Sequence, residues 1–348
     1  MIETTTVDVD GHEVHVLTIA NDTCKAVVTD LGARLLELHV PDRDGVFADI
    51  VLQRSTFDEI ATDDNYMGST AGRFANRIRG GKLTIDGKPI QLSINEGNNH
   101  LHGGTSGFDR KTWNADQDSQ ANEVTFRRIS PAGEEGYPGN LTMSVTYRLD
   151  ARSLSIDIAA TTDEPTVVNT VHHSYFNLGG HQSGTILDHL LEMRSEYYLP
   201  VDDELLPTGE VRKIEGTPFD FRRPTAIGAH IAEVQHSGAG RVTESGVGYD
   251  HNFVLTGTGM REVVFVTDPV SGRQLTMSTN QPGVQLYVGG YLEGVTAKVP
   301  AGKYPAFAGF TLETQTFPDA PNISHFPSAV LRHGENYLNS VRFDFSTS

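Results

Sequence analysis

The sequence predicts an all-β fold in which antiparallel sheets pack face to face. Apolar and polar residues alternate through many segments, helical periodicity is brief wherever it occurs, and glycine is frequent and scattered, with 35 among 348 residues. Alternation with a period of two is typical of strands with one buried face, and turn-rich β proteins use glycine at their turns. Length alone would suggest roughly two domains. Because all-β architectures can absorb this length, we expect a single domain over residues 1–348.

The clearest strands lie in the middle of the chain. In residues 141–150, LTMSVTYRLD, every second side chain is apolar, and residues 153–160 repeat the pattern. The turn residues between them predict a hairpin. A second hairpin is expected over residues 82–93, where Asp86-Gly87 separates two alternating arms. Further strands are predicted at residues 12–20, 33–40, 123–128, 261–268, 273–280, 284–290 and 340–345.

Helical signals are confined to two short segments. Residues 55–62 and 225–235 each predict a short helix, and no segment keeps a period of 3.6 for as many as four turns. Helices are therefore expected to be minor connecting elements.

The charge balance is acidic, with 27 basic and 45 acidic residues and a formal net charge of −18. Such a field favours solubility and disfavours a polyanionic partner such as nucleic acid.

The single cysteine, Cys24, excludes an internal disulfide framework. The first twenty residues contain neither a basic start nor a long apolar run, so we expect no signal peptide, no membrane segment and a cytoplasmic location.

Five segments combine ionisable or amide side chains with glycines or aromatic residues. They are residues 72–81, 98–104, 171–180, 246–255 and 310–322. Although they are far apart in the sequence, a folded β domain can bring them together. These segments hold most of the candidate functional residues.

The histidines of these segments have more than one interpretation. His100 and His102 are two residues apart, and on a strand they would share a face, an arrangement that suits metal ligation. However, no carboxylate follows them before Asp109, and a polar loop is the alternative. His172 and His173 are adjacent and would point to opposite faces of a strand, so only one of them can enter a given pocket. The alternative is that this segment is a core strand in which the histidine is simply packed and hydrogen-bonded.

Residue type alone does not decide the roles of the charged candidates. Glu313 has the apolar neighbours Phe310 and Leu312, and apolar surroundings raise the pKa of a carboxyl towards the range useful for a general base. The alternative interpretation is that Glu313 lies on a solvent-exposed face of a strand. Arg77 and Asp250 could be substrate-binding residues or members of surface ion pairs.

Together with residues 281–290, the segments resemble the aldose 1-epimerase (galactose mutarotase) family. The motifs are GRFANRIRGGKL, NNHLHGG, HHSYFNLGG, GYDHNFVL, QPGVQLYVGG and FTLETQTFPDAPN, in that order between about residues 68 and 327. The resemblance implies a β-supersandwich and an enzyme that interconverts the α and β anomers of free aldoses such as galactose and glucose. It also implies no cofactor and no metal. The partner would be a monosaccharide substrate, with no nucleic acid or membrane, and the enzyme would be a monomer or homodimer.

The resemblance implies a role for each matching residue. Glu313 matches the base that takes the proton of the C1 hydroxyl, and His173 matches the acid that protonates the ring oxygen. His102 matches a sugar-binding residue that also polarises the region of the ring oxygen. The other implied substrate contacts are Asn76, Arg77, Asp250 and Gln285. His172 stands where the family usually has asparagine, and alternation turns it away from the pocket.

Three other functions remain open from the sequence. A hexose-6-phosphate 1-epimerase would need extra basic residues for the phosphate, so the question is whether Arg73 or Arg79 reaches the pocket. A non-catalytic sugar-binding protein would not require an acid and a base together. A metal-dependent β-barrel enzyme would use the histidines as ligands.

Overall fold

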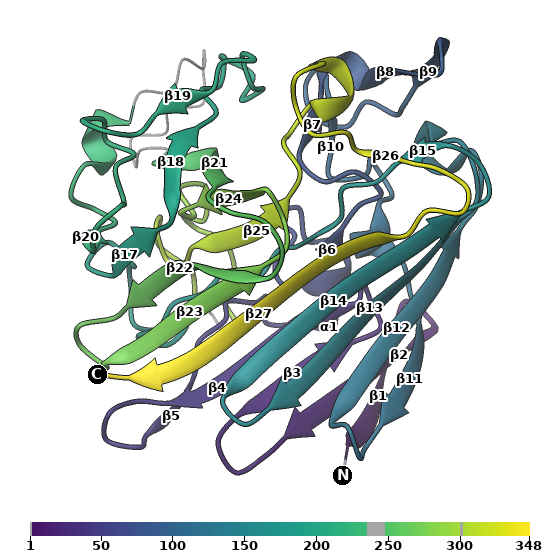
Figure 1. The fold of residues 1–348 in the computed structure, drawn as a ribbon. Coiled ribbons are helices and arrows are strands. Elements are labelled where there is room, and N and C mark those ends of the chain that lie inside the picture. The colour runs from purple at the N-terminus through teal and green to yellow at the C-terminus, as the bar shows by residue number, and fades with distance from the viewer. Residues whose placement is uncertain (1, 235–247, 300–301) are drawn as a thin grey trace.

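The computed structural model describes residues 2–234, 248–299 and 302–348, and strands dominate it (Figure 1). Its first sheet has five strands in the order β1-β2-β3-β4-β5. These strands are β1 Glu3–Val9, β2 His12–Ala20, β3 Lys25–Thr29, β4 Arg34–Pro41 and β5 Phe47–Asp49. All neighbouring pairs in this sheet are antiparallel.

The largest sheet has nine strands and runs across the front of the view in Figure 1. Their order is β11-β12-β13-β14-β27-β23-β22-β17-β20, so the C-terminal strand lies in the centre of the sheet. The strands are β11 Asn114–Asp118, β12 Glu123–Ser130, β13 Leu141–Asp150, β14 Ser153–Thr162, β27 Tyr337–Thr347, β23 Arg273–Thr279, β22 Arg261–Thr267, β17 Leu190–Met193 and β20 Thr225–Ala226.

A third sheet of five strands has the order β19-β18-β21-β24-β25. Its strands are β19 Arg212–Lys213, β18 Ser195–Tyr198, β21 Asp250–Leu255, β24 Gly283–Tyr287 and β25 Thr311–Gln315. Four two-stranded pairs complete the described strands: β6 Thr70–Ala71 with β16 Val171–His172, β7 Arg77–Ile78 with β10 His100–Leu101, β8 Lys82–Ile85 with β9 Lys88–Gln91, and β15 Thr166–Val167 with β26 Val330–Leu331.

The main hydrophobic core lies between the sheets and takes side chains from all three. It includes Ile19 and Val28 of the first sheet, Val145 and Ile156 of the largest sheet, and Phe253 and Leu286 of the third. Strand β13 shows why the sequence folds this way, because its apolar residues are buried while its polar ones are mostly not. The predicted all-β fold of antiparallel sheets is therefore confirmed.

Both predicted hairpins are present. Strands β13 and β14 pair from Leu141 opposite Thr162 to Asp150 opposite Ser153. Strands β8 and β9 are joined by Asp86 and Gly87, whose φ angles are 50° and 77°. Positive φ at both central residues is the geometry of the type I′ turn that the Asp-Gly pair predicts. The other strands predicted from alternation are also found.

One predicted helix is present and the other is not. Residues 55–62 contain the helix α1 Phe57–Ala61, which begins with a capping box formed by Thr56 and Glu59. The helix predicted over residues 225–235 is wrong: residues 225–226 form β20, which pairs with β17, and only a 3-10 turn, η4 Ile231–Glu233, follows. Residue 235 lies outside the described residues. By pairing with β17 at the edge of the largest sheet, residues 225–226 obtain hydrogen bonds for their backbone N–H and C=O groups without forming a helix.

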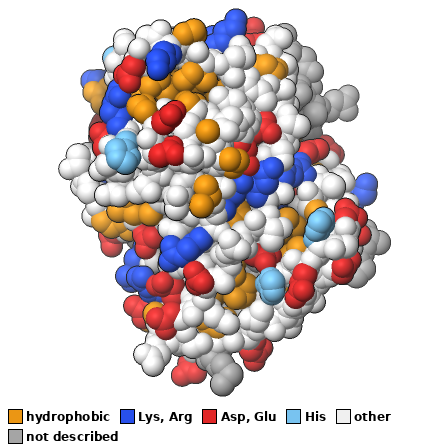
Figure 2. Space-filling model, turned by 90° about the vertical axis from the view of Figure 1, so that its right-hand side faces the viewer, with side chains coloured by type: hydrophobic (Ala, Val, Ile, Leu, Met, Phe, Trp, Pro, Cys, Tyr) orange, Lys and Arg blue, Asp and Glu red, His pale blue; other side chains and the backbone are white. Residues whose placement is uncertain are grey.

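The remaining turns are short, and the surface is mixed in charge. Four further 3-10 turns are η1 Arg79–Gly81, η2 Phe108–Arg110, η3 Glu134–Gly136 and η5 Ala320–Asn322. Within the described ranges, no helix is both long enough and apolar enough to span a membrane. Figure 2 shows acidic, basic and hydrophobic side chains interspersed on one face of the molecule.

Candidate active site

A cavity of about 770 Å³ lies where the five polar segments converge. Every segment contributes at least one lining residue, among them Arg77, His102, His173, Asp250 and Glu313. A cavity of this size is ordinary for small-molecule sites, which usually measure about 300–1,000 Å³. The structure thus brings together side chains that are far apart in the sequence, from Asp64 to Glu313.

Glu313 and His173 lie next to each other in this cavity. Glu313 stands in the middle of β25, where all five residues are buried, so the strand does not present a solvated face. Its Oε1 lies 3.4 Å from Nε2 of His173 and accepts a hydrogen bond of 3.0 Å from the hydroxyl of Thr311. Burial raises the pKa of Glu313, and the neighbouring His173 opposes that rise. A buried carboxyl whose pKa is raised therefore lies directly beside an imidazole.

Two atoms of this pair lack partners. Oε2 of Glu313 and Nδ1 of His173 are both buried, and neither has a hydrogen-bond partner among the described residues. Buried polar atoms are normally paired in folded proteins, so an exception calls for an explanation. A bound ligand with polar groups would supply the partner that Glu313 lacks.

His102 presents a defined tautomer to the cavity. Its Nδ1 accepts a hydrogen bond of 3.3 Å from the backbone N–H of Asn76, so a neutral ring must carry its proton on Nε2. Burial lowers the pKa of His102 well below its ordinary value, and the nearby His173 and Arg77 lower it further. At neutral pH, His102 is therefore an uncharged hydrogen-bond donor.

The glycines behind His102 allow two backbones to meet. His102 itself has a φ of 49°, and Gly103 and Gly104 follow with φ angles of 93° and 104°. A Cβ atom added to Gly103 would lie 1.8 Å from the carbonyl oxygen of Gly72. The segment can therefore pack against residues 72–73 only with glycine at this position.

His100 is separated from the cavity. It is fully buried, its Nε2 lies 2.6 Å from the hydroxyl of Tyr137, and its Nδ1 lies 2.8 Å from the carbonyl oxygen of Ser93. The positive φ of His102 breaks the alternation that would have placed both rings on one face. His100 therefore has a structural environment, and the two rings do not form a ligand pair.

His172 also faces away from the cavity. Its Nε2 lies 2.6 Å from the hydroxyl of Ser174, and its Nδ1 lies 3.3 Å from that of Tyr147. Burial lowers the pKa of His172 to about 3. Of the two adjacent histidines, only His173 lines the cavity.

Asn76 and Arg77 enter the cavity from β7 and the residue before it. Asn76 has a φ of 61°, and its side-chain oxygen accepts a hydrogen bond of 2.8 Å from the backbone N–H of Arg77. The guanidinium of Arg77 forms an ion pair with Glu96, a residue that sequence reasoning did not select. Both Arg77 and Glu96 line the cavity.

Asp250 and Gln285 have different positions. Asp250, at the start of β21, lines the cavity, but Gln285 of β24 is not among the lining residues. The amide of Gln285 donates to Oδ1 of Asp250 at 2.7 Å, and its oxygen accepts from Gln315 at 3.3 Å. The structure thus places Gln285 behind Asp250, where it fixes the carboxylate.

Aromatic side chains form much of the remaining wall. The ring of Tyr66 lies 4.5 Å from that of His102, and Tyr175 lies 5.2 Å from His173. Tyr287 and Tyr291 also line the cavity. Tyr175 lies in the polar segment 171–180 and Tyr287 in the strand predicted over residues 284–290, whereas no pattern in the sequence marks Tyr66 or Tyr291.

Neither of the two arginines left open by the sequence reaches the cavity. Arg73 is buried, and its guanidinium bonds to Ser130 and to the carbonyl oxygens of Pro131, Pro138 and Gly139. Arg79 pairs with Asp202 at 2.6 Å and is not among the lining residues.

The donor set of the cavity is also compatible with a metal ion. One ligand atom from each of His102, His173 and Glu313 can be chosen so that all lie within 4.8 Å of one another. Two imidazoles and a carboxylate are common ligands of divalent transition metals. However, the bond from Asn76 to Nδ1 of His102 leaves only a protonated nitrogen facing outward, and a metal would have to displace that proton.

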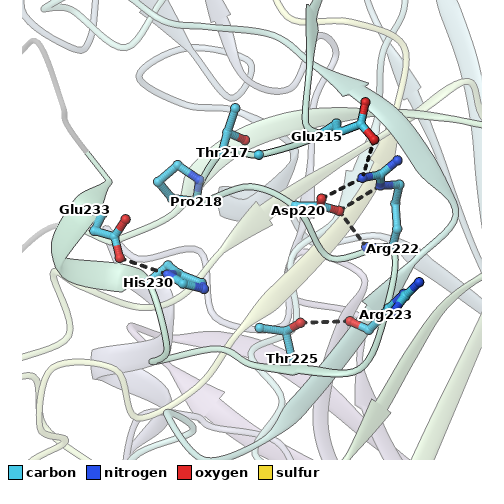
Figure 3. Close-up of a pocket in the computed structure, with 10 residues that line it drawn as sticks. Glu215, Thr217, Pro218, Asp220, Arg222, Arg223, Thr225, His230 and Glu233 are labelled. Carbon is cyan, nitrogen blue, oxygen red and sulfur yellow. Dashed lines mark hydrogen bonds and ion pairs between the residues drawn. The ribbon is translucent and has the colours of Figure 1, made fainter.

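A second hollow of about 680 Å³ lies elsewhere (Figure 3). Its charged side chains mainly pair with one another: Arg222 contacts Asp220 and Glu215, and His230 contacts Glu233. None of the five polar segments lines it. The acid and base candidates are in the first cavity, so we assign the functional site there.

Comparisons with known proteins agree with this geometry. A family model described as aldose 1-epimerase matches residues 15–344. The galactose mutarotase of Bos taurus is 40% identical over 331 residues, which cover 95% of this chain and 93% of that protein. The aldose 1-epimerase of Escherichia coli strain K12 is 34% identical over 349 residues, covering 99% and 98% of the two chains.

Solved structures show the same relationship. An aldose epimerase homologue from C. elegans superposes with a TM-score of 0.86 at 30% identity and covers 99% of both chains. A galactose 1-epimerase from Lactobacillus acidophilus superposes with a TM-score of 0.84 at 28% identity, covering 100% of this chain and 99% of that one. With its cavity, its strands and its full-length matches in agreement, the chain belongs to the aldose 1-epimerase family.

Proposed function

We propose that the protein is an aldose 1-epimerase that interconverts the α and β anomers of free aldoses such as galactose and glucose. Glu313 is the general base and His173 the general acid. The observation that carries the proposal is the buried carboxyl and imidazole, 3.4 Å apart, in a cavity that also holds neutral hydrogen-bonding side chains. Family membership over nearly the whole chain supports the same activity.

The spacing of acid and base suits the chemistry of a hemiacetal. Ring opening removes the proton from the C1 hydroxyl and adds a proton to the ring oxygen, and both oxygens are bonded to the same carbon. A base and an acid must therefore lie side by side, as Glu313 and His173 do. The open aldehyde rotates about C1–C2, and the ring closes with the two roles reversed. A positioned acid or base typically contributes about 10²–10⁴-fold to the rate.

The other lining residues orient the sugar. The neutral ring of His102 offers its Nε2–H to a sugar oxygen near the reacting carbon. Asn76, Arg77 and Asp250 bind ring hydroxyls, and Gln285 holds the Asp250 carboxylate by its 2.7 Å hydrogen bond. The aromatic wall supplies apolar surface for the C–H faces of the ring. A protein that only binds sugar would need this orientation but not the paired acid and base.

The charges around the cavity favour a neutral sugar over a sugar phosphate. Two arginines line it, and both are engaged: Arg77 with Glu96, and Arg110 with Asp64 and Asp109. The carboxylates are in excess and comprise Asp64, Glu96, Asp109, Asp203, Glu204, Asp250 and Glu313. A phosphate would meet this negative field without a free cation among the lining residues that the structure describes.

Exchange spectroscopy on sugars at anomeric equilibrium tests the proposal. We expect the protein to speed α–β exchange of glucose and galactose, with kcat/KM for glucose 6-phosphate at least about 10-fold lower because of like-charge repulsion. Equal or faster exchange of glucose 6-phosphate would favour a hexose-6-phosphate 1-epimerase. Sugar binding without any exchange would favour a binding protein.

We further propose that residues 1–348 act as one domain, because one core contains side chains from all three large sheets. A monomer or homodimer, a cytoplasmic location and the lack of a cofactor or of nucleic-acid and membrane partners stay predictions from the sequence.

A further inference from the structure

Arg77 and Glu96 form a largely buried ion pair in the wall of the cavity. Nε of Arg77 donates to Oε2 of Glu96 at 3.2 Å, and Nη2 donates to Oε1 at 2.9 Å. The side chains are only 10% and 22% exposed, respectively. A two-point contact between guanidinium and carboxylate fixes orientation as well as distance.

The backbone holds Glu96 at one place relative to Arg77. Glu96 lies in a tight turn closed by two hydrogen bonds with Asn99, of 3.1 and 2.8 Å, and Gly97 has a φ of 57°. The side chain of Asn95 bonds both backbone groups of Leu101, at 2.8 and 3.0 Å. Leu101 is in turn the strand partner of Arg77 in the β7–β10 pair. The asparagine-rich turn therefore ties the carboxylate to the strand that carries the guanidinium.

The ion pair leaves Nη1 of Arg77 available to donate hydrogen bonds to a ligand. The two bonds to Glu96 use Nε and Nη2, and the structure gives Nη1 no hydrogen-bond partner within residues 2–234, 248–299 and 302–348. Two other carboxylates compete for the same cation: the charge of Asp250 raises the pKa of Arg77, and Arg77 lowers that of Glu313. Without Glu96, the guanidinium would be drawn towards these carboxylates.

We propose that Glu96 is a positioning residue that holds Arg77 with Nη1 open to the substrate hydroxyls and apart from Asp250 and Glu313. The inference rests on the proposed function, because it takes an aldose as the ligand of Arg77. Glu96 itself needs no contact with the sugar.

A double-mutant cycle with steady-state kinetics on galactose tests this role. Arg77 binds hydroxyls before and during the reaction, so its displacement should weaken substrate and transition state alike. For Glu96→Gln we expect KM to rise about 5- to 20-fold, together with a smaller loss of kcat of up to about tenfold, because the displaced guanidinium would also pair with the base Glu313. Because Glu96 acts only through Arg77, the double variant Glu96→Gln/Arg77→Met should have the KM of Arg77→Met alone.

Two further variants separate charge from structure. Asp202→Asn also removes a carboxylate from an arginine pair, that of Arg79, but Asp202 does not line the cavity, so KM should equal that of wild type. Glu96→Asp keeps the charge on a shorter side chain and should recover most of the lost affinity. If side-chain size alone mattered, Glu96→Asp would be worse than Glu96→Gln, and that order would overturn the inference.

The remaining outcomes are equally decisive. A wild-type KM for Glu96→Gln, or effects of Glu96→Gln and Arg77→Met that multiply in the double variant, would overturn the positioning role while leaving the proposed function intact. An Arg77→Met enzyme with wild-type kinetics would remove the sugar contact itself and the inference with it. A wild-type protein that does not anomerise galactose would instead refute the proposed function.

Discussion

The Glu313→Gln variant examines the base of the mechanism most selectively. Glutamine has nearly the same size as glutamate and can accept the hydrogen bond that Thr311 now donates to Oε1. It cannot take a proton from the C1 hydroxyl at neutral pH. The substitution therefore removes basicity from a site that is 2% exposed while leaving the packing of β25 in place.

The expected fall in kcat follows from the loss of the general base. A general base contributes about 10²–10⁴-fold, and we expect kcat to fall by that factor with a much smaller change in KM. Residual activity should come from His173 and from the groups that orient the sugar.

Polarimetry of freshly dissolved α-galactose measures kcat and KM for this variant and for a matched one. Asp250→Asn also neutralises a carboxylate in the same cavity, but the proposed role of Asp250 is to bind hydroxyls, so KM should rise together with any loss of kcat. If Glu313→Gln anomerised galactose within about twofold of wild type, as expected of a surface change below about 0.5 kcal/mol, the assignment of the base would be refuted.

His102→Asn should lower kcat/KM more than about tenfold, roughly 1.4 kcal/mol, whereas His100→Asn should affect mainly stability; a larger kinetic effect at His100 would contradict the assignment. Because burial raises the pKa of Glu313 and the base must be ionised, kcat/KM should fall with decreasing pH through a pKa above the ordinary glutamate value, and a profile flat down to pH 4.5 would argue against this. Asp63→Ala should lower the free energy of unfolding in urea by about 3–5 kcal/mol, because it removes the carboxylate that faces two guanidiniums, that of the buried Arg34 at 3.7 Å and that of Arg54 at 2.8 Å; a change below about 1 kcal/mol would show that water or another carboxylate, such as Asp109, compensates.

Much of the fold is predictable because one-sided burial leaves a period of two in the sequence. Strand β13 is the clearest case, since its alternation and its burial coincide. Strand β1 has no such pattern because most of its residues are exposed at the edge of the first sheet. The helix predicted over residues 225–235 is wrong because tertiary pairing with β17 overrides a weak local signal.

The site residues are predictable to a different degree. Motif matches indicated His102, His173 and Glu313, and all three line the cavity. The role of Glu96 depends on a contact across 19 positions that no local pattern encodes. The position of Gln285 behind Asp250 depends on the register of neighbouring strands, in which Gln285 lies opposite Asn252 and Glu313. Such relations come from the tertiary fold rather than from residue type.

The most direct test of the central claim is the relaxation of α-galactose by wild-type protein that has been dialysed against EDTA. The control matters because His102, His173 and Glu313 could also hold a metal ion. If Glu313 and His173 act as base and acid, the optical rotation should reach equilibrium at a rate that rises in proportion to the protein concentration and is the same before and after EDTA. No acceleration over buffer, or an acceleration that EDTA abolishes and a divalent ion restores, would contradict the account.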